Sequence, residues 1–257
     1  MNNSIIILAG PGESAKLMYN ELKNNFNIEK VILENSQSKS KIIKYRIKNF
    51  GFVNVFGQLL FSLLIVRFLK ILYRDRKKEI LNEFKLELTS IPKDKVVFVS
   101  SVNSDFAREE INKCNSNFII VSGTRIIGHK TLSAVDKTLI NIHAGITPKY
   151  RGVHGAYWAL INQDKGFCGV TVHNVDKGVD TGRIIAQSLI QITKKDSFVT
   201  YPLLQFAIGV NLLKNILEDM FNEVSLDYPV FHTYESSQYY HPTIWKYIYG
   251  YFKLKIK

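Results

Sequence analysis

Five short runs of apolar residues recur along the first 144 residues, and polar or glycine-rich segments separate them. They lie at residues 5–10, 30–35, 94–101, 115–123 and 138–144. After the first run, Gly10 and Gly12 break the pattern, and apolar residues then recur at helical spacing. Buried strands that alternate with helices predict an α/β fold. We expect an open, mostly parallel, twisted sheet with helices on both faces.

Beyond residue 154 the pattern changes. Residues 166–175 and 182–192 alternate or run apolar as neighbouring strands would, and residues 196–220 predict a long helix capped by Asp196 or Ser197. We expect a catalytic domain of residues 1–200 that contains a helical insertion at about 40–95. Residues 201–257 then form a C-terminal helix and an aromatic, basic extension packed on the same domain.

Residues 52–72 are apolar enough to require a membrane test. Asn54, Gly57 and Gln58 interrupt the run, and Arg67 and Lys70 follow before about 18 unbroken apolar residues accumulate. We therefore expect a mostly buried helix and no transmembrane segment. No signal peptide is visible at the start of the chain.

The net charge indicates which kinds of partner the protein could bind, and the cysteine content indicates its cellular compartment. The net charge is +12, which favours an anionic partner such as a nucleotide, a nucleic acid or an anionic membrane. A simpler interpretation of the Lys- and Arg-rich runs is that they form solvent-exposed faces without a specific partner. Cys114 and Cys168 lie far apart without metal-ligand spacing, so we expect reduced thiols and a cytoplasmic protein.

Polar clusters follow several predicted strands, and they are the candidates for chemistry. Because ligands of an open α/β sheet bind beyond the carboxyl ends of its strands, the clusters at 10–14, 122–125 and 141–151 should meet at one edge. A fourth cluster, 176–182, brackets Asp180 with Gly178 and Gly182. Taken singly, Asn141 could end a strand, His143 could be a core residue, and Asp180 could belong to a turn.

Together, Asn141, His143 and Asp180 supply the functional groups that an acyl transfer needs. An imidazole moves protons, an amide donates to a developing oxyanion, and a carboxylate orients the imidazole. Gly145 stands where a nucleophilic side chain would be expected after His143. The pattern therefore favours direct acyl transfer from a bound donor over a covalent acyl-enzyme.

The stretch 141–160 (NIHAGITPKYRGVHGAYWAL) and the later GVTVHNVDKGVDTGRII resemble the N10-formyltetrahydrofolate-dependent formyltransferases, which have a Rossmann-like fold. The similarity is strong over about 117–192 and absent over 40–95. It implies that Asn141 binds the formyl oxygen, that His143 assists proton movement, and that Asp180 holds the histidine or an ordered water and helps to take the proton of the amine. The donor is N10-formyltetrahydrofolate, and no metal is implied.

The resemblance also implies binding residues. The pterin would lie against Ser122, Gly123, Thr124, Arg125, Ile126 and Ile127, and against Asp176, Lys177, Gly178 and Val179. The acceptor would contact Gly10, Gly12, Glu13 and Ser14, where relatives bind phosphate, together with Tyr150, Arg151 and His154. His154 has the simpler alternative of a solvent-facing residue at the start of a helix. The serine that follows the histidine by two positions in many relatives is Gly145 here.

The acceptor is inferred from two differences between this chain and the other formyltransferases, a missing second domain and an added helical segment. The room after Tyr201 is too small for the second domain that tRNA-formylating relatives carry, so no nucleic acid is expected. The helical insertion is foreign to the purine-pathway enzymes. The sugar-nucleotide formyltransferases of surface polysaccharide (O-antigen and lipopolysaccharide) biosynthesis fit better, with a dTDP- or GDP-linked 4-amino-4,6-dideoxyhexose as acceptor. Alternatives are another small amine, such as glycinamide ribonucleotide, or a catalytically silent relative that binds nucleotide sugars or anionic lipid.

The sequence does not fix the oligomeric state, and the aromatic tail is compatible with a homodimer.

Overall fold

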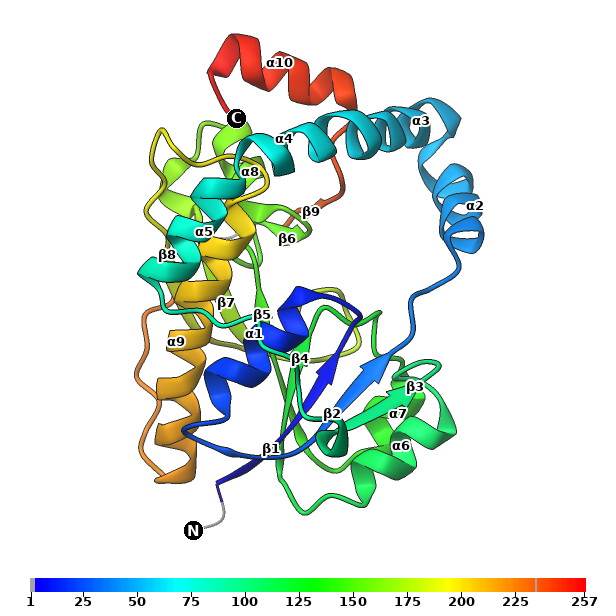
Figure 1. Ribbon diagram of the computed structural model, residues 1–257, viewed down its shortest axis with the longest axis vertical. Helices are drawn as coiled ribbons and strands as arrows, with labels where there is room; N and C mark the ends of the chain where they lie inside the picture. Colours follow the sequence, from blue (N-terminus) through cyan, green and yellow to red (C-terminus); the bar gives the residue numbers. More distant parts are fainter. Residues whose placement is uncertain (1–2, 234) are drawn as a thin grey trace.

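A seven-stranded sheet forms the centre of the molecule (Figure 1). The computed structural model describes residues 3–233 and 235–257. The strand order is β3-β2-β1-β4-β5-β7-β8. The strands are β1 (Ser4–Ala9), β2 (Asn27–Glu34), β3 (Val96–Val99), β4 (Phe118–Ser122), β5 (Thr138–His143), β7 (Gly169–Asn174) and β8 (Ile184–Leu189).

The first five strands are parallel, and β7 and β8 are antiparallel to their neighbours. All six residues of β1 are buried, since the strand pairs with β2 on one side and β4 on the other. Burial on both faces explains why the strand reads as a continuous apolar run. The predicted fold class is confirmed.

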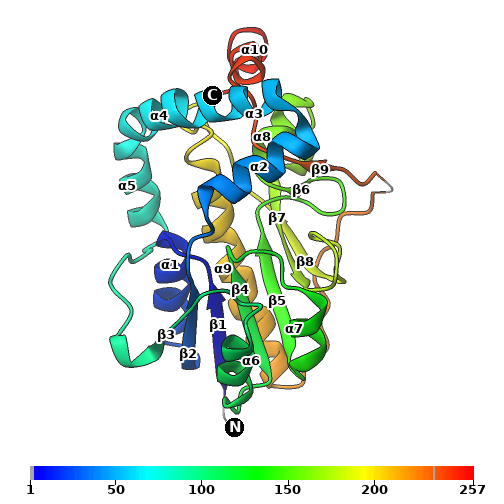
Figure 2. The same ribbon diagram turned by 90° about the vertical axis from the view of Figure 1, so that its right-hand side faces the viewer.

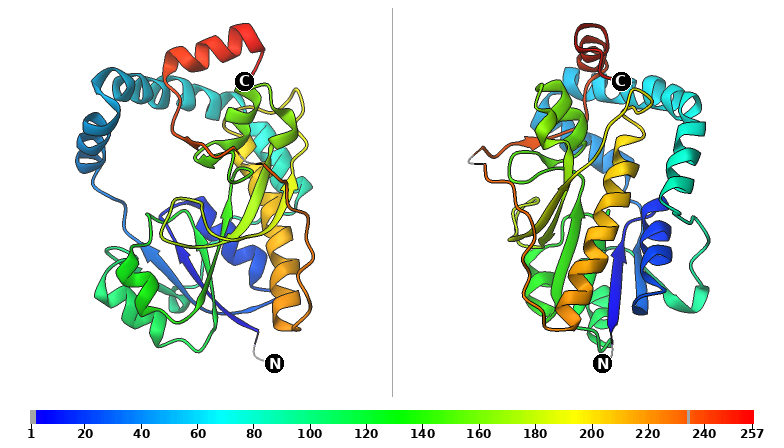
Figure 3. Two further views of the ribbon diagram at one scale, coloured as in Figure 1. Left: turned by 180° about the vertical axis from the view of Figure 1, so that it is seen from behind. Right: turned by 90° about the vertical axis from the view of Figure 1, so that its left-hand side faces the viewer.

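Helices cover both faces of the sheet (Figures 1 and 3). On one face, α1 (Glu13–Leu22) and α9 (Tyr201–Phe221) bury apolar side chains against alternate residues of the strands, such as Ile7 and Ile120. On the other face, α6 (Asp105–Asn112) and α7 (His129–Ala134) pack against Ile6 and Ile119. The alternation along each strand thus feeds two separate cores.

A further group of helices lies at one end of the molecule (Figure 2). These are α2 (Lys39–Phe50), α3 (Phe52–Leu60), a π-helical turn (Phe61–Ile65), α4 (Val66–Leu72), α5 (Arg74–Glu83) and the C-terminal α10 (Ile244–Leu254). The π-helical turn, α4, α5 and α10 share a third core with α8 (Gly155–Ile161), in which Phe61 packs on Phe198 and Tyr247, whereas α2 has no buried residue. Two short strands, β6 (Arg151–Gly152) and β9 (Gln238–Tyr239), pair below α10.

The expectation of a mostly buried helix at 52–72 is wrong. The side chains of Leu64, Phe68 and Ile71 are 57%, 61% and 78% exposed. Among the described residues, Phe52–Leu72 is the helical segment long and apolar enough to cross a membrane, and 28% of its most apolar window is buried. Hydropathy alone could not reveal this exposure, because it measures the side chains and not what covers them.

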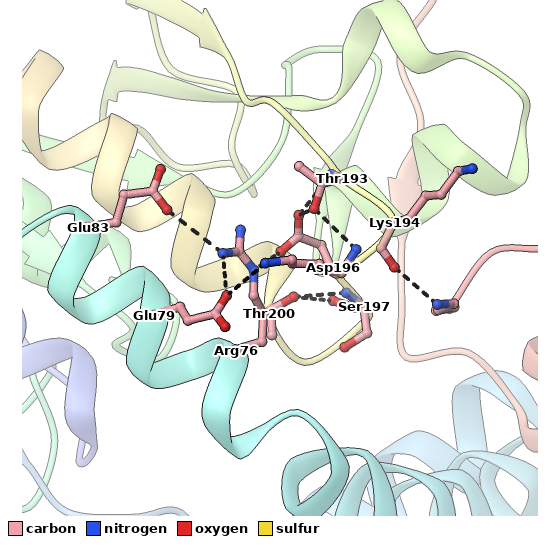
Figure 4. Close-up of polar contacts among 10 residues, drawn as sticks. Arg76, Glu79, Glu83, Thr193, Lys194, Asp196, Ser197 and Thr200 are labelled. Carbon is pink, nitrogen blue, oxygen red and sulfur yellow. Dashed lines mark hydrogen bonds and ion pairs between the residues drawn. The ribbon is translucent and has the colours of Figure 1, made fainter.

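The predicted cap of the long helix is also wrong. The helix begins at Tyr201 with Thr200 as its N-cap residue, and no side chain caps it. The carboxylate of Asp196 instead accepts hydrogen bonds from the backbone and hydroxyl of Thr193 and, at 2.7 Å, from Nε of Arg76 (Figure 4). This buried ion pair fastens α5 to the loop before α9.

Candidate active site

The chain reverses its direction of progress across the sheet between β1 and β4, because β2 and β3 lie on one side of β1 and β4 and β5 on the other. Ligands of such sheets bind at this switch point, beyond the carboxyl ends of the strands. The loops that leave β1 and β4 touch there: the N–H of Gly10 donates to the carbonyl of Ser122 at 3.0 Å. A Cβ on Gly10 would lie 2.0 Å from the carbonyl oxygen of Gly123, so this close approach requires glycine.

The end of β5 carries Asn141 and His143 on one side of the strand, because they are two residues apart. The antiparallel neighbour β7 places His173 opposite Asn141 and Thr171 opposite His143. Residues opposite each other on paired strands point to the same face. The sheet register alone therefore brings an amide and two imidazoles together.

Asp180 reaches this group from the connection between β7 and β8. Its backbone is left-handed, with φ 52°, and its Oδ2 lies 3.2 Å from Nδ1 of His143. The same Oδ2 accepts a hydrogen bond from the N–H of Gly152 at 2.9 Å, and Oδ1 lies 3.8 Å from Nε2 of His173. The expected pairing of Asp180 with the histidine is thus present in the structure.

Hydrogen bonds lower the pKa of Asp180 and fix the ring of His143. Burial raises the pKa of Asp180, but the bond and charge of His143 and the N–H of Gly152 outweigh it and hold the pKa below its ordinary value. Nε2 of His143 lies 2.7 Å from the carbonyl oxygen of Tyr150, which can only accept. The ring of His143 is thus held between a carboxylate and a carbonyl oxygen, which fixes its orientation beside Asn141.

His173 is a site residue that the sequence analysis missed. Its Nδ1 donates to the carbonyl of Asn174 at 2.7 Å, which leaves Nε2 to accept from the amide of Asn141 at 3.2 Å. Burial lowers the pKa of His173, so the ring is neutral near pH 7. His173 thereby orients the amide of Asn141. A polar residue inside the apolar run GVTVHNV was the available signal.

A cavity of about 360 Å³ opens beside these four residues. Its lining residues include the apolar Ile126, Val153 and Val179, and the other members of two loop stretches, 123–127 and 175–180 without Lys177. A mainly apolar cavity with a few polar groups suits a flat heterocycle that needs several hydrogen bonds. The described residues include no group of three or more His, Cys, Asp and Glu side chains that could hold a metal ion.

Most of the predicted pterin-binding residues line this cavity, namely Gly123, Thr124, Arg125, Ile126, Ile127, Asp176, Gly178 and Val179. Ser122 and Lys177 are not among the lining residues. The guanidinium of Arg125 forms an ion pair with Glu34, in which Nε lies 2.6 Å from Oε2. This ion pair holds the loop that follows β4 in place. That these residues bind a pterin stays a prediction.

The structure places some of the predicted acceptor-binding residues near the cavity and others away from it. Gly10, Gly12, Glu13 and Ser14 lie beyond β1 at the switch point, next to the cavity but not among its lining residues. Arg151 donates to the carbonyl of Val179 at 3.1 Å, and its buried Nε has no hydrogen-bond partner among the described residues.

Two of the predicted acceptor contacts need correction. The Tyr150 side chain is fully buried and its hydroxyl donates to Asp164, so it does not reach the cavity. His154 neither lines the cavity nor faces solvent as a simple helix start: its ring packs on Phe198 and its Nε2 lies 3.0 Å from Nδ1 of His241.

Comparisons with known proteins agree with this geometry. Residues 76–202 match the family described as formyl transferase. The methionyl-tRNA formyltransferase of Thermodesulfovibrio yellowstonii is 34% identical over 113 residues, which are 44% of this chain and 36% of that protein. The methionyl-tRNA formyltransferase of Agathobacter rectalis is 39% identical over 90 residues, 35% of this chain and 29% of that protein. The aligned regions thus span about a third of these relatives.

Solved structures share the fold at low identity. A sugar N-formyltransferase from Shewanella sp. aligns with a TM-score of 0.55 and 14% identity, over 92% of this chain and 76% of that chain. The phosphoribosylglycinamide formyltransferase of Streptococcus pneumoniae has a TM-score of 0.54 and 18% identity, over 86% and 99%. An N-formyltransferase of Helicobacter canadensis, in complex with folinic acid and dTDP-3-aminofucose, has a TM-score of 0.51 and 18% identity, over 91% and 70%.

Proposed function

We propose, from the formyl transferase match at residues 76–202, that the protein transfers a formyl group from N10-formyltetrahydrofolate to the amine of a nucleotide-linked amino-dideoxysugar. The observation that carries the proposal is the hydrogen-bonded group of Asn141, His143, His173 and Asp180 beside the switch-point cavity. A bound donor would supply the formyl carbon to an attacking amine, with loss of one amine proton and gain of one proton by the folate nitrogen.

The four side chains divide the work of such a transfer. The amide of Asn141, held by His173, is free to donate a second N–H to the formyl oxygen as negative charge develops there. His143, held by Asp180 and by the carbonyl of Tyr150, lies next to the same position and is the residue that would assist proton movement. Asp180, ionised and within reach of both histidines, is the group suited to take up the proton of the amine.

The acceptor is inferred to carry phosphate. Helix α1 begins at the switch point. Its N-cap residue is Gly12, which has no side chain to cap the N–H groups of the first turn. The carboxylate of Glu13 is already paired with Lys77 at 2.6 Å. Uncapped N–H groups at a helix start, with a lysine nearby, favour an anionic ligand such as the diphosphate of a nucleotide sugar.

A second acceptor has support from sequence. The relatives at 34–39% identity are named methionyl-tRNA formyltransferases, but the match spans only about a third of them. A glycinamide ribonucleotide-like amine is the third candidate, because a structure with that activity in its name shares the fold. We place the reaction in the cytoplasm, where the buried, free thiols of Cys114 and Cys168 stay reduced.

The proposal is tested by incubating the protein with N10-formyltetrahydrofolate and one acceptor at a time. The panel contains dTDP- and GDP-linked 4-amino-4,6-dideoxyhexoses, glycinamide ribonucleotide and methionyl-tRNA, and each product is weighed by mass spectrometry. Formyl mass on an aminosugar supports the proposal. Formyl mass on methionyl-tRNA or glycinamide ribonucleotide alone overturns the sugar assignment and keeps formyl transfer. Folate binding without turnover of any acceptor indicates a silent relative.

A further inference from the structure

Helices α2, α3, α4 and α10 lie at one end of the molecule (Figures 1 and 2), and many large apolar residues of this end are exposed. We call it the apical end, and it comprises Lys39–Leu72 together with Ile244–Leu254. Along α3 and α4, exposed apolar residues recur at helical spacing, among them Phe56, Leu63, Leu64, Phe68 and Ile71. Contiguous exposed apolar surface on a soluble fold marks an interaction site.

The helical segment Phe52–Leu72 lies on the body of the protein by one side only. Phe61 and Leu69 are buried in the third core, and Gln58 donates from its side chain to the carbonyl of His241 at 3.0 Å. A Cβ on Gly57 would overlap the ring of Trp245 in α10. These contacts hold the segment against the body of the protein, and apolar residues on its other side, such as Phe68 and Ile71, are exposed. The segment is therefore amphipathic with respect to the rest of the protein.

The apical end and the segments that adjoin it in the sequence also account for the net charge of the whole chain. Residues 35–74 and 236–257 contain twelve of the 34 Lys and Arg residues and none of the 22 Asp and Glu residues. The remainder of the chain has 22 basic and 22 acidic residues, and is neutral. The net charge of +12 thus lies on α2, α4 and α10 and the segments next to them, beside the exposed apolar side chains.

This combination selects one kind of partner. A second copy of the chain would bring one cluster of twelve basic residues against another, which repels. A nucleic acid would neutralise the charge but leave the exposed Leu, Phe and Ile side chains without a partner. An anionic bilayer accepts both, because apolar side chains enter the acyl boundary while Lys and Arg reach the lipid phosphates.

We propose that the apical end binds the surface of an anionic phospholipid membrane, with the segment Phe52–Leu72 lying in the plane of the interface. Peripheral attachment suffices, because spanning the bilayer would require the segment to leave the core that holds Phe61 and Leu69. The sheet edge that carries Asn141 and His143 remains part of the body below. The proposal is independent of which amine is formylated.

The test uses the full chain and vesicles of phosphatidylcholine, with or without phosphatidylglycerol, in a flotation assay. We expect binding to vesicles with phosphatidylglycerol at low salt, weaker binding at high salt, and little binding to phosphatidylcholine alone. Phe68→Asn should weaken partitioning by at least about tenfold, because a buried phenyl ring is lost from the interface. Phe106→Asn on α6, an exposed Phe away from the apical end, is the matched control and should bind normally.

A second pair of variants tests the charge. Lys44→Glu/Lys48→Glu should lower partitioning by at least about 25-fold, since each basic residue near an anionic surface contributes about fivefold. Lys85→Glu/Lys93→Glu changes the net charge equally at exposed positions outside the apical end and should have a much smaller effect. Thermal unfolding of each variant checks that the fold is unchanged, since all four lysines are exposed.

Several results would overturn the proposal. These are no binding to phosphatidylglycerol vesicles at low salt, equal losses in the test and control variants, or protein that resists extraction by alkaline carbonate and so spans the bilayer. A dimer in sedimentation that Phe68→Asn dissociates, without vesicle binding, would assign the surface to a second copy. Binding of nucleic acid in place of vesicles would also refute it. None of these results bears on the formyl-transfer assay, so the two proposals fail separately.

Discussion

Adding one methyl group at Gly145 should disable the site without replacing Asn141, His143, His173 or Asp180. A Cβ at this position would lie 2.3 Å from the carbonyl oxygen of Tyr150 and 2.7 Å from Nε2 of His143, the two atoms that form the 2.7 Å hydrogen bond between them. Ordinary contact needs about 3.4 Å or more between such atoms, so the ring or the carbonyl must move by roughly 1 Å. Overpacking of this kind costs about 1–3 kcal/mol.

The expected result for Gly145→Ala is a loss of about 100-fold in kcat/KM, because a misplacement of about 1 Å in a catalytic group has that effect. The assay follows formyl transfer to the acceptor that the panel identifies, at equal concentrations of folded protein. Gly166→Ala is the matched control, since nothing lies within 4 Å of a Cβ added there. A rate within about threefold of the parent protein, with unchanged thermal stability, would refute the role given to the His143–Tyr150 contact.

Three further predictions concern the catalytic pair, a buried ion pair and a pair of histidines. Asp180→Asn and His143→Asn should each lower kcat by at least about 100-fold with intact folate binding, and near-normal rates in stopped-flow assays would place the chemistry elsewhere. Arg76→Met should cost about 3 kcal/mol in urea unfolding, because it strands the buried Asp196 carboxylate, with two Thr193 hydrogen bonds left. Lys78→Met, which breaks the exposed pair with Asp75, should cost less than about 1 kcal/mol, and equal losses would contradict the argument. Burial lowers the pKa of His154 to about 3 and that of His241 to about 4. The unfolded chain therefore takes up protons first, and stability should fall as pH drops from about 6.5 towards 4. Thermal unfolding against pH should show a flatter profile for His241→Gln than for the parent, and identical profiles would contradict this linkage.

Local patterns were sufficient for the sheet and for most of the site. The strands are continuous apolar runs because parallel strands are buried on both faces, as the six buried residues of β1 show. Asn141 and His143 stand at the end of such a run, so their position at the switch-point edge follows from the fold class. Asp180 could be predicted to approach them only through the family resemblance, because its contact with His143 crosses 37 positions in the chain.

The failures share a physical cause, which is pairing between distant segments. Asp196 reads locally as a helix cap, but Arg76, 120 residues earlier, takes its carboxylate. His173 gains its role from the register of β7 against β5. Tyr150 looks like a substrate contact beside Arg151, whereas its ring fills the third core. The exposure of Phe52–Leu72 depends on how few elements pack on it, which its composition does not encode.

The most direct test of the account is single-turnover formyl transfer by the parent protein and by Asn141→Ala, His143→Asn and Asp180→Asn. Each is mixed with N10-formyltetrahydrofolate and the nucleotide-linked aminosugar, and the formylated product is weighed over time. The account predicts rapid gain of formyl mass by the sugar with the parent protein and a loss of at least about 100-fold with each variant. No formyl mass on any amine with the parent protein, or full rates with the variants, would contradict it.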